Sequence, residues 1–368
     1  MELERLELEG FRNYVRQAAD FDPRCNVICG ENAQGKTNLL EAIVYLSRGR
    51  SPRARTDREM LGFEAESARL LALVRSRGRS FRVQADLFRG RRRSLLVNQV
   101  PLKTGAALGD VYHTVLFQPE DLYLIREGAA ARRRFMDTAL CQLRPRYAAA
   151  LAGYERAREQ KTRILRDFGE RPDLLAALPE FNEQMIRLGA ALIHYRHRFC
   201  LRLGEYAAVH HRECSGGREH LEIRYQTVSS VQDPGGEPGR LAEELRTHMA
   251  AHREAELASR LCLSGPHKDD LLVTIDGREA KTYSSQGQTR TAALALKLAE
   301  REIYKNAAGE YPVLLLDDVL SELDPRRQEF VLNRIAGGQV FITCCEEDRL
   351  PSLLGGKVFH VERGTIRQ

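Results

Sequence analysis

An eight-residue segment near the N-terminus limits most strongly what this chain can fold into. Residues 30–37 read GENAQGKT and match the pattern G-x-x-x-x-G-K-[S/T] at every fixed position. A short strand-like run, residues 26–29, precedes the segment, and the helix-like stretch NLLEAIVYL follows it. Glycines let backbone N–H groups curl around a phosphate chain, and the dipole of a following helix favours its negative charge. The sequence therefore predicts an α/β domain in which a strand, a phosphate-binding loop and a helix follow one another.

The residue types in this loop indicate ATP and Mg²⁺ as its ligands. Lys36 is expected to act on the β- and γ-phosphates as a point charge, and the hydroxyl of Thr37 to bind Mg²⁺. A glycine-rich loop that fits the pattern by chance is the alternative, and the strand and helix on either side argue against it. The predicted nucleotide-binding residues of this segment are Gly30, Glu31, Asn32, Ala33, Gln34, Gly35, Lys36, Thr37 and Asn38.

A second segment, residues 312–324 (PVLLLDDVLSELD), has the pattern of a buried parallel strand that ends in acidic residues. Asp317 is expected to hold the Mg²⁺, and Asp318 to polarise the attacking water. An ordinary strand followed by a polar turn is the alternative for this segment taken alone. Phosphoryl transfer, however, needs such a carboxylate-bearing strand beside the phosphate-binding loop.

The composition is that of an ordinary globular protein, with 43% hydrophobic and 29% charged residues. Apolar runs are too short to span a bilayer and the N-terminus has no signal-peptide core, so we expect a cytoplasmic protein without a membrane partner. The 8 cysteines contain no CxxC pair and are expected to be reduced core thiols, rather than zinc ligands or a disulfide framework. The net charge of +6 permits a polyanionic partner but does not identify one.

The 368 residues are enough for two domains, or for one large domain with an insertion. Strand-like segments occur in residues 1–131 and return in residues 263–368, whereas long helix patterns dominate residues 132–262. In this middle part, apolar residues recur at helical spacings of 3 and 4, at Met185, Leu188, Leu192, Tyr195 and Phe199. We therefore predict a head formed by the two ends of the chain, with residues 132–262 inserted as a helical arm.

Residues 284–300 (SSQGQTRTAALALKLAE) begin a helix in an unusual way. Small and polar residues precede the apolar period, and such a helix start can bind an anion. The chain already has a complete phosphate-binding loop, and Ser285 follows Thr37 by 248 residues (285 − 37). A second phosphate-binding helix start is therefore expected to complete the site of another molecule. A simple helix cap is the alternative.

These features resemble the ATP-binding-cassette ATPases, in which the loop of one subunit and a signature helix of the other enclose one ATP. Residues 285–288 (SQGQ) resemble the Ser-Gly-Gly-Gln signature, with Gln in place of the first Gly, and residues 321–324 (SELD) resemble the D-loop. Thr343 lies where cassette transporters usually have a switch histidine. By this resemblance the predicted nucleotide-binding residues also include Ser285, Gly287, Gln288 and Asp324.

Several segments together resemble the RecF family of recombination-repair proteins: GFRNY (10–14), GENAQGKTNLLEAI (30–43), FQPEDL (117–122), RRRFMD (132–137), SGPHKDDL (264–271), SSQGQTRTAALALKLAE and LLLDDVLSELD (314–324). The resemblance implies a P-loop ATP-binding-cassette ATPase head of mixed sheets and helices with an inserted helical arm. It implies an ATP-dependent homodimer that binds single-stranded and duplex DNA at gap junctions, with weak DNA-stimulated ATP hydrolysis used as a switch. It also implies action with RecO and RecR, with RecA loading as the outcome.

The same resemblance implies roles for further residues. The Q-loop role falls on Gln118, for which an ordinary loop residue is the alternative, and Arg12 lies where the family's N-terminal strand approaches the nucleotide. Asp318 stands where most cassette enzymes have Glu, which is one methylene longer, so slow turnover is expected. Asp318, Lys36 and Gln118 are the predicted catalytic residues. His267 and Lys268 are expected in a buried, hydrogen-bonded turn.

Arginine clusters are the candidates for DNA contact. The segment FRGRRRS lies between two strand patterns, reads as an exposed hairpin tip, and contains Arg89, Arg91, Arg92 and Arg93. Residues 48–55 and 132–134 contain further arginines, and a solvated loop is the alternative for each cluster. No aromatic residues interleave with these clusters, so phosphate contact with a duplex is favoured over stacking on a single strand.

Two other functions stay open at this point. An SMC- or Rad50-like chromosome-maintenance ATPase would have far longer coiled coils, whereas the insert here has about 130 residues and no CxxC hook. A P-loop kinase or other small-molecule ATPase would leave the helix start at residues 285–288 and the SELD turn without a role.

Overall fold

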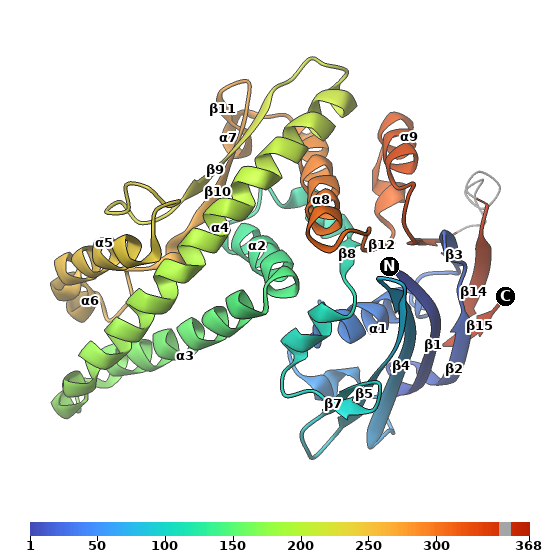
Figure 1. Cartoon of the computed structure of the whole chain (residues 1–368), viewed down its shortest axis with the longest axis horizontal. Coiled ribbons are helices and arrows are strands. Elements are labelled where there is room, and N and C mark those ends of the chain that lie inside the picture. The colour runs from blue at the N-terminus through green and yellow to red at the C-terminus, as the bar shows by residue number, and fades with distance from the viewer. Residues whose placement is uncertain (346–354) are drawn as a thin grey trace. The chain divides into compact units, whose positions relative to one another are not determined.

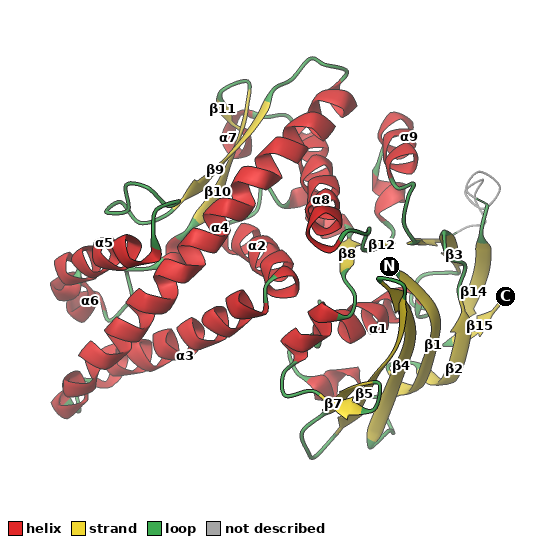
Figure 2. Cartoon of the chain, in the orientation of Figure 1, coloured by secondary structure: helices red, strands yellow, loops and turns green. Residues whose placement is uncertain are grey.

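The computed structural model describes residues 1–345 and 355–368, which form two compact α/β units (Figure 1; Figure 2). The first unit joins Met1–Leu122 with Leu296–Gln368, and the second is Tyr123–Ala295. Both ends of the chain therefore build one unit, and the middle of the chain builds the other. Among the residues described, no helix is long and apolar enough to cross a membrane.

An antiparallel sheet with the strand order β2-β1-β4-β5-β6-β7 forms one part of the first unit. Along its strand β1, buried Leu6 and Leu8 alternate with the more accessible Glu7 and Glu9, which is the period expected when one face of a sheet packs on a core. The strands are β1 (Glu2–Phe11), β2 (Tyr14–Asp20), β4 (Ser67–Ser76), β5 (Arg79–Phe88), β6 (Ser94–Val97) and β7 (Val100–Pro101).

The second sheet of this unit has the order β15-β14-β3-β13-β12-β8 and is parallel except for β15. Its strands are β3 (Cys25–Cys29), β8 (Thr114–Phe117), β12 (Val313–Leu316), β13 (Val340–Cys344), β14 (Lys357–Glu362) and β15 (Thr365–Arg367). Strands β3, β8 and β12 are buried at every residue, as is typical of parallel strands covered on both faces. Because parallel strands end at one edge, the segments that follow them meet there.

One hydrophobic cluster contains residues of both sheets and of helix α1 (Lys36–Arg48), which is buried along most of its length. Phe21 contacts the rings of Phe341 and Phe359 edge-on, with centroid distances of 4.8 and 5.3 Å, and so links β13 and β14 to this core. The unit also contains α9 (Pro325–Arg334) and 3-10 helices at Asp57–Met60, Gly105–Asp110, Pro119–Tyr123 and Val319–Glu322, the third of which ends across the boundary of the units.

The second unit consists of helices around a small antiparallel sheet, β11-β10-β9. The 38-residue helix α4 packs against α3, α5 and β9. The elements are α2 (Ala129–Leu143), α3 (Pro145–Asp167), α4 (Leu178–Ser215), α5 (Pro238–Ala251), α6 (Arg253–Ser259), α7 (Ala280–Tyr283), β9 (Leu221–Gln226), β10 (Asp270–Ile275), β11 (Arg278–Glu279), and 3-10 helices at Pro172–Ala177 and Pro266–Lys268. Helix α8 (Gln286–Ala308) begins in this unit and continues in the first.

This unit extends beyond the arm expected at residues 132–262. Strand β10 pairs with β9 along its whole length, so residues 263–295 fold with the middle of the chain rather than with the head. On the other side, α2 begins before residue 132, at Ala129. The expected apolar stripe lies on α4, where Met185, Leu192 and Phe199 are buried.

A buried arginine joins α4 to the turn at residues 264–270. Arg196 donates to the carboxylate of Asp137 at 2.8 Å, to the carbonyl oxygen of Pro266 at 2.7 Å and to the carboxylate of Asp269 at 3.1 Å. Burial raises the pKa of Asp269 to about 6, although the charge of Arg196 lowers it. The turn is therefore fixed by charge as well as by backbone geometry.

His267 and Lys268, which were expected in a buried, hydrogen-bonded turn, differ in their exposure to solvent. His267 is half-buried, with Nδ1 2.7 Å from the hydroxyl of Tyr154 and Nε2 3.1 Å from the carbonyl oxygen of Cys262. Burial lowers the pKa of His267 to about 4, so the ring is neutral at pH 7. Lys268, in contrast, is exposed.

The buried ion pair between Lys161 and Glu256 predicts a large loss of stability for one substitution. Their charged atoms lie 2.6 Å apart, and the side chains are 0% and 4% exposed. Glu256→Gln leaves the Lys161 charge buried without a counter-charge, so we expect the free energy of unfolding to fall by about 3–5 kcal/mol. The control is Glu183→Gln, which breaks the exposed pair with Arg246 and should cost less than about 1 kcal/mol. Urea unfolding followed by circular dichroism measures both, and equal small losses would contradict the prediction.

Candidate functional site

The predicted phosphate-binding loop follows strand β3 and precedes α1, at the edge where the parallel strands end. Three of its residues have positive φ angles, Gly30 at 151°, Ala33 at 66° and Gly35 at 124°. A Cβ atom on Gly30 would lie 2.3 Å from the carbonyl oxygen of Val361, so only glycine fits there. Such a loop in front of a helix N-terminus is suited to an anion.

Segments distant in the sequence hold the backbone of this loop at Gln34 and Gly35. The hydroxyl of Tyr14 donates to the carbonyl oxygen of Gly35 at 2.9 Å, and the side-chain amide of Asn13 donates to that of Gln34 at 2.8 Å. The backbone N–H of Gly364, in the turn between β14 and β15, donates to the same Gln34 oxygen at 3.0 Å. The sequence motif does not reveal these supports.

Lys36 is buried at the start of α1, with its ammonium group over its own loop. Its Nζ donates to the carbonyl oxygen of Gly30 at 2.5 Å and lies 3.3 Å from that of Glu31. Carbonyl oxygens are weak partners for a buried ammonium, and phosphate oxygens would be stronger ones. The residues present therefore fit the phosphate chain of a nucleotide.

Asp317, at the end of β12, is the centre of a hydrogen-bond network. The hydroxyls of Thr37 and Thr343 donate to its Oδ1 at 3.1 and 2.9 Å, and the side chain of Gln118 also hydrogen-bonds to this carboxylate. Burial raises the pKa of Asp317 above its ordinary value, although these bonds lower it. A carboxylate whose charge is poorly compensated, with hydroxyl and amide oxygens beside it, offers the oxygen ligands that Mg²⁺ prefers.

This network brings together residues predicted from three separate motifs. Thr37, Gln118 and Asp317 line one small pocket, together with Glu41 and Arg53. Thr343, which stands at the switch-histidine position, also accepts a hydrogen bond from the backbone N–H of Asp318 at 2.8 Å. Its hydroxyl thus connects both acidic residues.

Asp318 and Asp324 occupy the two ends of the turn after β12. Asp318 is half-buried and has a φ angle of 51°, in the left-handed region that Asp tolerates better than most residues. The hydroxyl of Ser321 donates to its carbonyl oxygen at 2.6 Å. Asp324 is the N-cap of α9 and accepts the backbone N–H of Arg327 at 3.1 Å. A contact of Asp324 with nucleotide stays a prediction.

Arg12 has a structural role close to the loop. It forms a bidentate pair with the buried Glu41 of α1, with both nitrogen–oxygen distances at 2.9 Å, and Arg53 joins the same carboxylate at 2.7 Å. Burial opposes the charge of Glu41, but the bonds from Arg12 and Ser51 and the charge of Arg53 outweigh it, so the pKa of Glu41 is lowered. Direct contact of Arg12 with nucleotide stays a prediction.

In the second unit, the helix start at residues 285–288 forms a capping box. The hydroxyl of Ser285 accepts the backbone N–H of Gln288 at 3.2 Å, and the side-chain oxygen of Gln288 accepts the backbone N–H of Ser285 at 2.8 Å. Ser285 is exposed and Gly287 is half-buried. Ser285 and Gln288 therefore cap the helix. The start of the helix is still accessible, so the predicted role in binding nucleotide is compatible with this cap.

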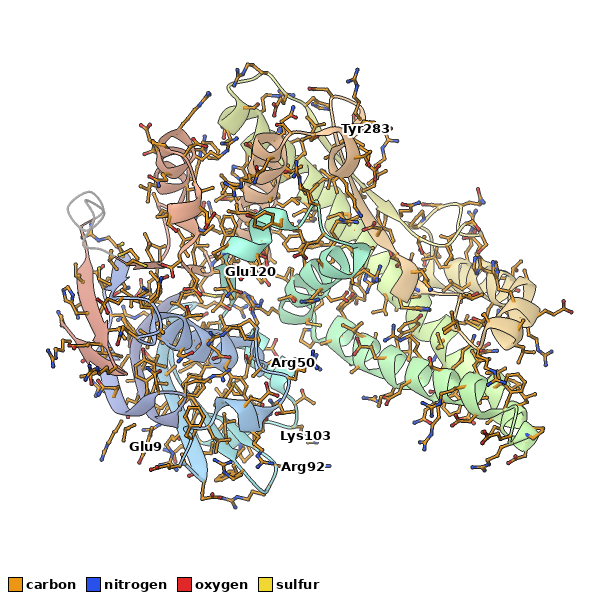
Figure 3. All side chains as sticks on the ribbon, turned by 180° about the vertical axis from the view of Figure 1, so that it is seen from behind. Glu9, Arg50, Arg92, Lys103, Glu120 and Tyr283 are labelled. Atoms are coloured by element: carbon orange, nitrogen blue, oxygen red, sulfur yellow. The ribbon has the colours of Figure 1, made fainter. Side chains whose placement is uncertain are left out.

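The arginine cluster forms the expected hairpin loop between β5 and β6. Arg91 and Arg92 are exposed, and Figure 3 shows Arg92 at the edge of the first unit. Arg89 donates to the carbonyl oxygen of Ala65 at 3.0 Å, and Arg93 donates to the hydroxyl of Tyr45 at 2.8 Å. Arg89 and Arg93 are therefore partly used inside the unit. Arg91 lies with its guanidinium 3.6 Å over the ring centre of Phe88, but it and Arg92 are exposed and are the better DNA candidates.

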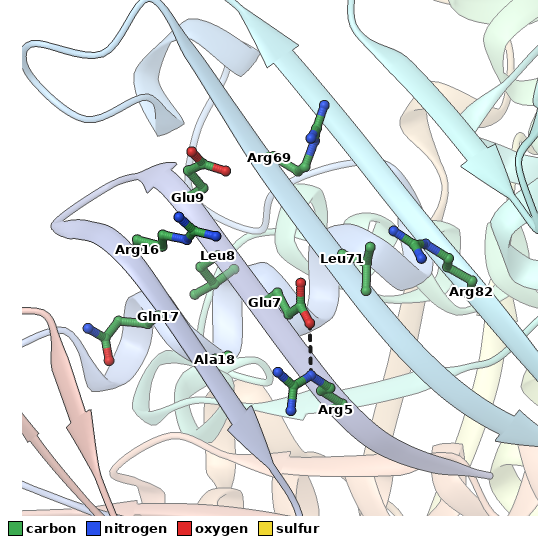
Figure 4. A pocket seen from close by; sticks show the side chains of 10 residues that line it. All are labelled: Arg5, Glu7, Leu8, Glu9, Arg16, Gln17, Ala18, Arg69, Leu71 and Arg82. Carbon is green, nitrogen blue, oxygen red and sulfur yellow. Dashed lines mark hydrogen bonds and ion pairs between the residues drawn. The ribbon is translucent and has the colours of Figure 1, made fainter.

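A hollow on the outer face of the antiparallel sheet contains none of the predicted residues (Figure 4). Two of the four arginines that line it are paired within the sheet, Arg5 with Glu7 at 2.8 Å and Arg69 with Asp86 at 2.7 Å. We therefore place the functional site at the ends of the parallel strands.

Cysteines lie close to the loop, which the sequence did not predict. Cys345 is an exposed residue, and its sulfur lies 3.5 Å from Nζ of Lys36 and 3.1 Å from the side-chain oxygen of Asn32. The sulfurs of Cys29 and Cys344, on neighbouring strands, are 3.3 Å apart. No disulfide is present in the described part of the chain.

Comparison with known proteins identifies relatives along the whole chain. Residues 2–354 match the model of the RecF/RecN/SMC N-terminal domain family. The DNA replication and repair protein RecF of Agathobacter rectalis is 37% identical over 368 residues, which cover 100% of this chain and 99% of that protein. The RecF of Pelotomaculum thermopropionicum is 38% identical over 367 residues, which cover 100% of both chains.

The chain is also similar to solved structures over its whole length. The recombination mediator protein RecF with ATP, described as part of the RecFOR pathway, matches with a TM-score of 0.90 and 33% identity, over 100% of this chain and 97% of that one. The Smc head domain of Pyrococcus furiosus matches with a TM-score of 0.56 and 16% identity, over 100% of this chain and 95% of that one, which shows the fold alone. The expected cassette ATPase head is thus confirmed.

The position of Cys345 predicts that ATP protects this thiol from alkylation. A phosphate chain that engages Lys36 would cover the sulfur beside it, so iodoacetamide should react about tenfold more slowly when ATP–Mg²⁺ is present at ten times its Kd. Mass spectrometry of the Cys345 peptide measures the rate. In the control variant Lys36→Met, the same ATP concentration should protect little. An unchanged rate in the unmodified protein would contradict the placement of the phosphates.

Proposed function

The chain belongs to the RecF family, and we propose from this premise that it is an ATP-driven dimeric clamp on DNA in replication and repair. The observation that supports the proposal most directly is the convergence of residues 30–37, Gln118 and Asp317 at one sheet edge. These groups come from three distant segments and match what phosphoryl transfer needs.

In this proposal the loop binds the phosphates of ATP through its backbone N–H groups and Lys36. Thr37 and Asp317 would hold Mg²⁺, which neutralises charge on the phosphates when it is bound. Gln118 would couple this site to the segment that follows β8, because its backbone N–H donates to the carboxylate of Asp121 at 2.9 Å.

Hydrolysis in this proposal depends on Asp318. The residue lies one position beyond Asp317, and the hydroxyl of Thr343 fixes its backbone. Its carboxylate would orient and polarise the attacking water. Because Asp reaches one methylene less far than Glu, turnover would be slow, as suits a switch rather than a motor.

Dimerisation is part of this proposal because a second helix start in the chain is suited to the phosphate of another copy. Ser285, Gly287 and Gln288 of one copy would close the site formed by residues 30–37 of the other copy. Each dimer would then hold two ATP molecules, and dissociation would follow hydrolysis.

The dimer would bind duplex DNA and gap junctions through its arginines, with Arg91 and Arg92 among the contacts. Solved relatives described as belonging to the RecFOR pathway support RecO and RecR as partners. RecA loading would be the outcome in this proposal. In this proposal the protein would act in the cytoplasm.

Asp318→Asn should separate ATP binding from hydrolysis. The amide cannot accept a proton from the water, so phosphate release should fall by about 100-fold or more, while ATP binding and ATP-dependent dimerisation persist. Lys36→Met is the contrasting variant, since it should weaken ATP binding itself. Turnover of Asp318→Asn close to that of the unmodified protein would contradict the assigned role.

The decisive test of the proposed function uses Ser285→Arg. The bulky side chain should block the phosphate of the partner copy without touching the loop of its own chain. Monomeric ATP binding should survive, whereas ATP-dependent dimerisation, measured by sedimentation, and hydrolysis should both fail.

Mixing Ser285→Arg with Lys36→Met should restore part of the activity. One composite site then combines the intact loop of the first variant with the intact helix start of the second, and the other site has both lesions. Normal dimerisation by Ser285→Arg alone would show that the helix start is only a cap.

The salt dependence of DNA binding tests the arginine hairpin. Arg91→Ala with Arg92→Ala should flatten the slope of log K against log salt by about 0.9 for each DNA phosphate that the protein no longer binds. The control is Arg79→Ala with Arg82→Ala, which removes the same charge from the other end of strand β5. If both double variants have the slope of the unmodified protein, DNA binds elsewhere.

A further inference from the structure

The side chain of Gln288 is held at both ends. Its oxygen accepts the backbone N–H of Ser285 at 2.8 Å, and its nitrogen donates to Oε1 of Glu219 at 3.1 Å. The reverse orientation of the amide would place oxygen against the carboxylate and NH₂ against an N–H group, so this network permits only one orientation. Glu219 therefore decides how the amide of Gln288 is presented.

Glu219 is itself anchored to the longest helix of the second unit. Its Oε2 lies 2.9 Å from Nε2 of His211, on the last turns of α4, and the His211 side chain is 0% exposed. Burial lowers the pKa of His211, so the ring is neutral at pH 7 and Nε2–H donates to the carboxylate.

The backbone beside Glu219 is fixed as well. Gly216 and Gly217 have φ angles of 70° and 77°, which turn the chain sharply after α4. The backbone N–H of His220 donates to the carboxylate of Asp276 at 2.9 Å, and the N–H of Asp276 donates to the carbonyl oxygen of His220 at 2.8 Å. The carboxylate of Glu219 thus stands on a rigid turn between α4 and β9.

We propose that Glu219 is a positioning residue that ties the amide of Gln288 to the end of α4 and thereby sets the affinity of this helix start for the nucleotide of the partner copy. The inference rests on the proposed function, because it requires that residues 285–288 close a second copy's site. Helix α4 has 38 residues and spans about 57 Å. A displacement of its C-terminal end would act on Gln288 through the side chains of His211 and Glu219.

The test is ATP-dependent dimerisation of Glu219→Ala, measured by sedimentation over a range of ATP concentrations. We expect dimerisation to weaken by about tenfold or more, because a charge-assisted bond is removed at each of two sites. ATP binding by the monomer should not change, because the loop at residues 30–37 is intact. The matched control is Glu222→Ala, which removes a more accessible carboxylate, paired with Arg224, in the following strand.

Two further variants separate positioning from a merely structural role. Glu219→Gln keeps an oxygen for Gln288, but its NH₂ group then faces Nε2 of His211, and a proton moved to Nδ1 would be buried without a partner, so dimerisation should recover in part. In a double-mutant cycle, Glu219→Ala should add little to the defect of Gln288→Ala, because both remove the same hydrogen bond.

The outcomes are distinct. Normal dimerisation of Glu219→Ala, or full additivity with Gln288→Ala, would overturn the positioning role and leave the proposed function intact. Normal dimerisation of Ser285→Arg would instead overturn the proposed function, whatever Glu219 does. Weak dimerisation of Glu219→Ala with recovery in Glu219→Gln and a non-additive cycle supports the inference.

Discussion

The buried carboxylate of Asp317 is the constraint on which the rest of the site depends. Removing a carboxylate from water is costly unless partners are supplied, and here they are the hydroxyls of Thr37 and Thr343 and the side chain of Gln118. These three residues lie in or after β3, β13 and β8. These strands are parallel and lie near one another in the sheet, so the residues at their carboxyl ends meet at one point. The site therefore forms only with this strand order.

Much of the fold and of the site follows from contiguous patterns in the sequence. The loop at residues 30–37, the strand before Asp317 and the helix after Ser285 each depend on local periodicity and local backbone geometry, which a short segment determines by itself. The boundaries of the helical unit were harder to predict, because they depend on the pairing of β9 with β10 across an interval of more than forty residues.

The contacts that support the site could not be predicted in the same way. Tyr14 and Gly364 both bond to the phosphate-binding loop, yet they lie at opposite ends of the chain and match no local pattern. The pairing of Arg12 with Glu41 is likewise absent from any local pattern, because a buried carboxylate attracts a nearby guanidinium of another segment, and the contact of Arg12 with nucleotide stays a prediction. The hydrogen bond between Glu219 and Gln288 could not be predicted either, because only folding brings these two distant residues together.

The position of β3 in its sheet has a consequence for how the protein is made. Both strands that flank β3, β13 and β14, lie more than 300 residues after it in the chain, so the strand before the phosphate-binding loop has no neighbours until those residues have been synthesised. Contacts of such long sequence separation form late in folding. A nascent chain can therefore complete its middle unit, residues 123–295, before the phosphate-binding loop has its sheet around it.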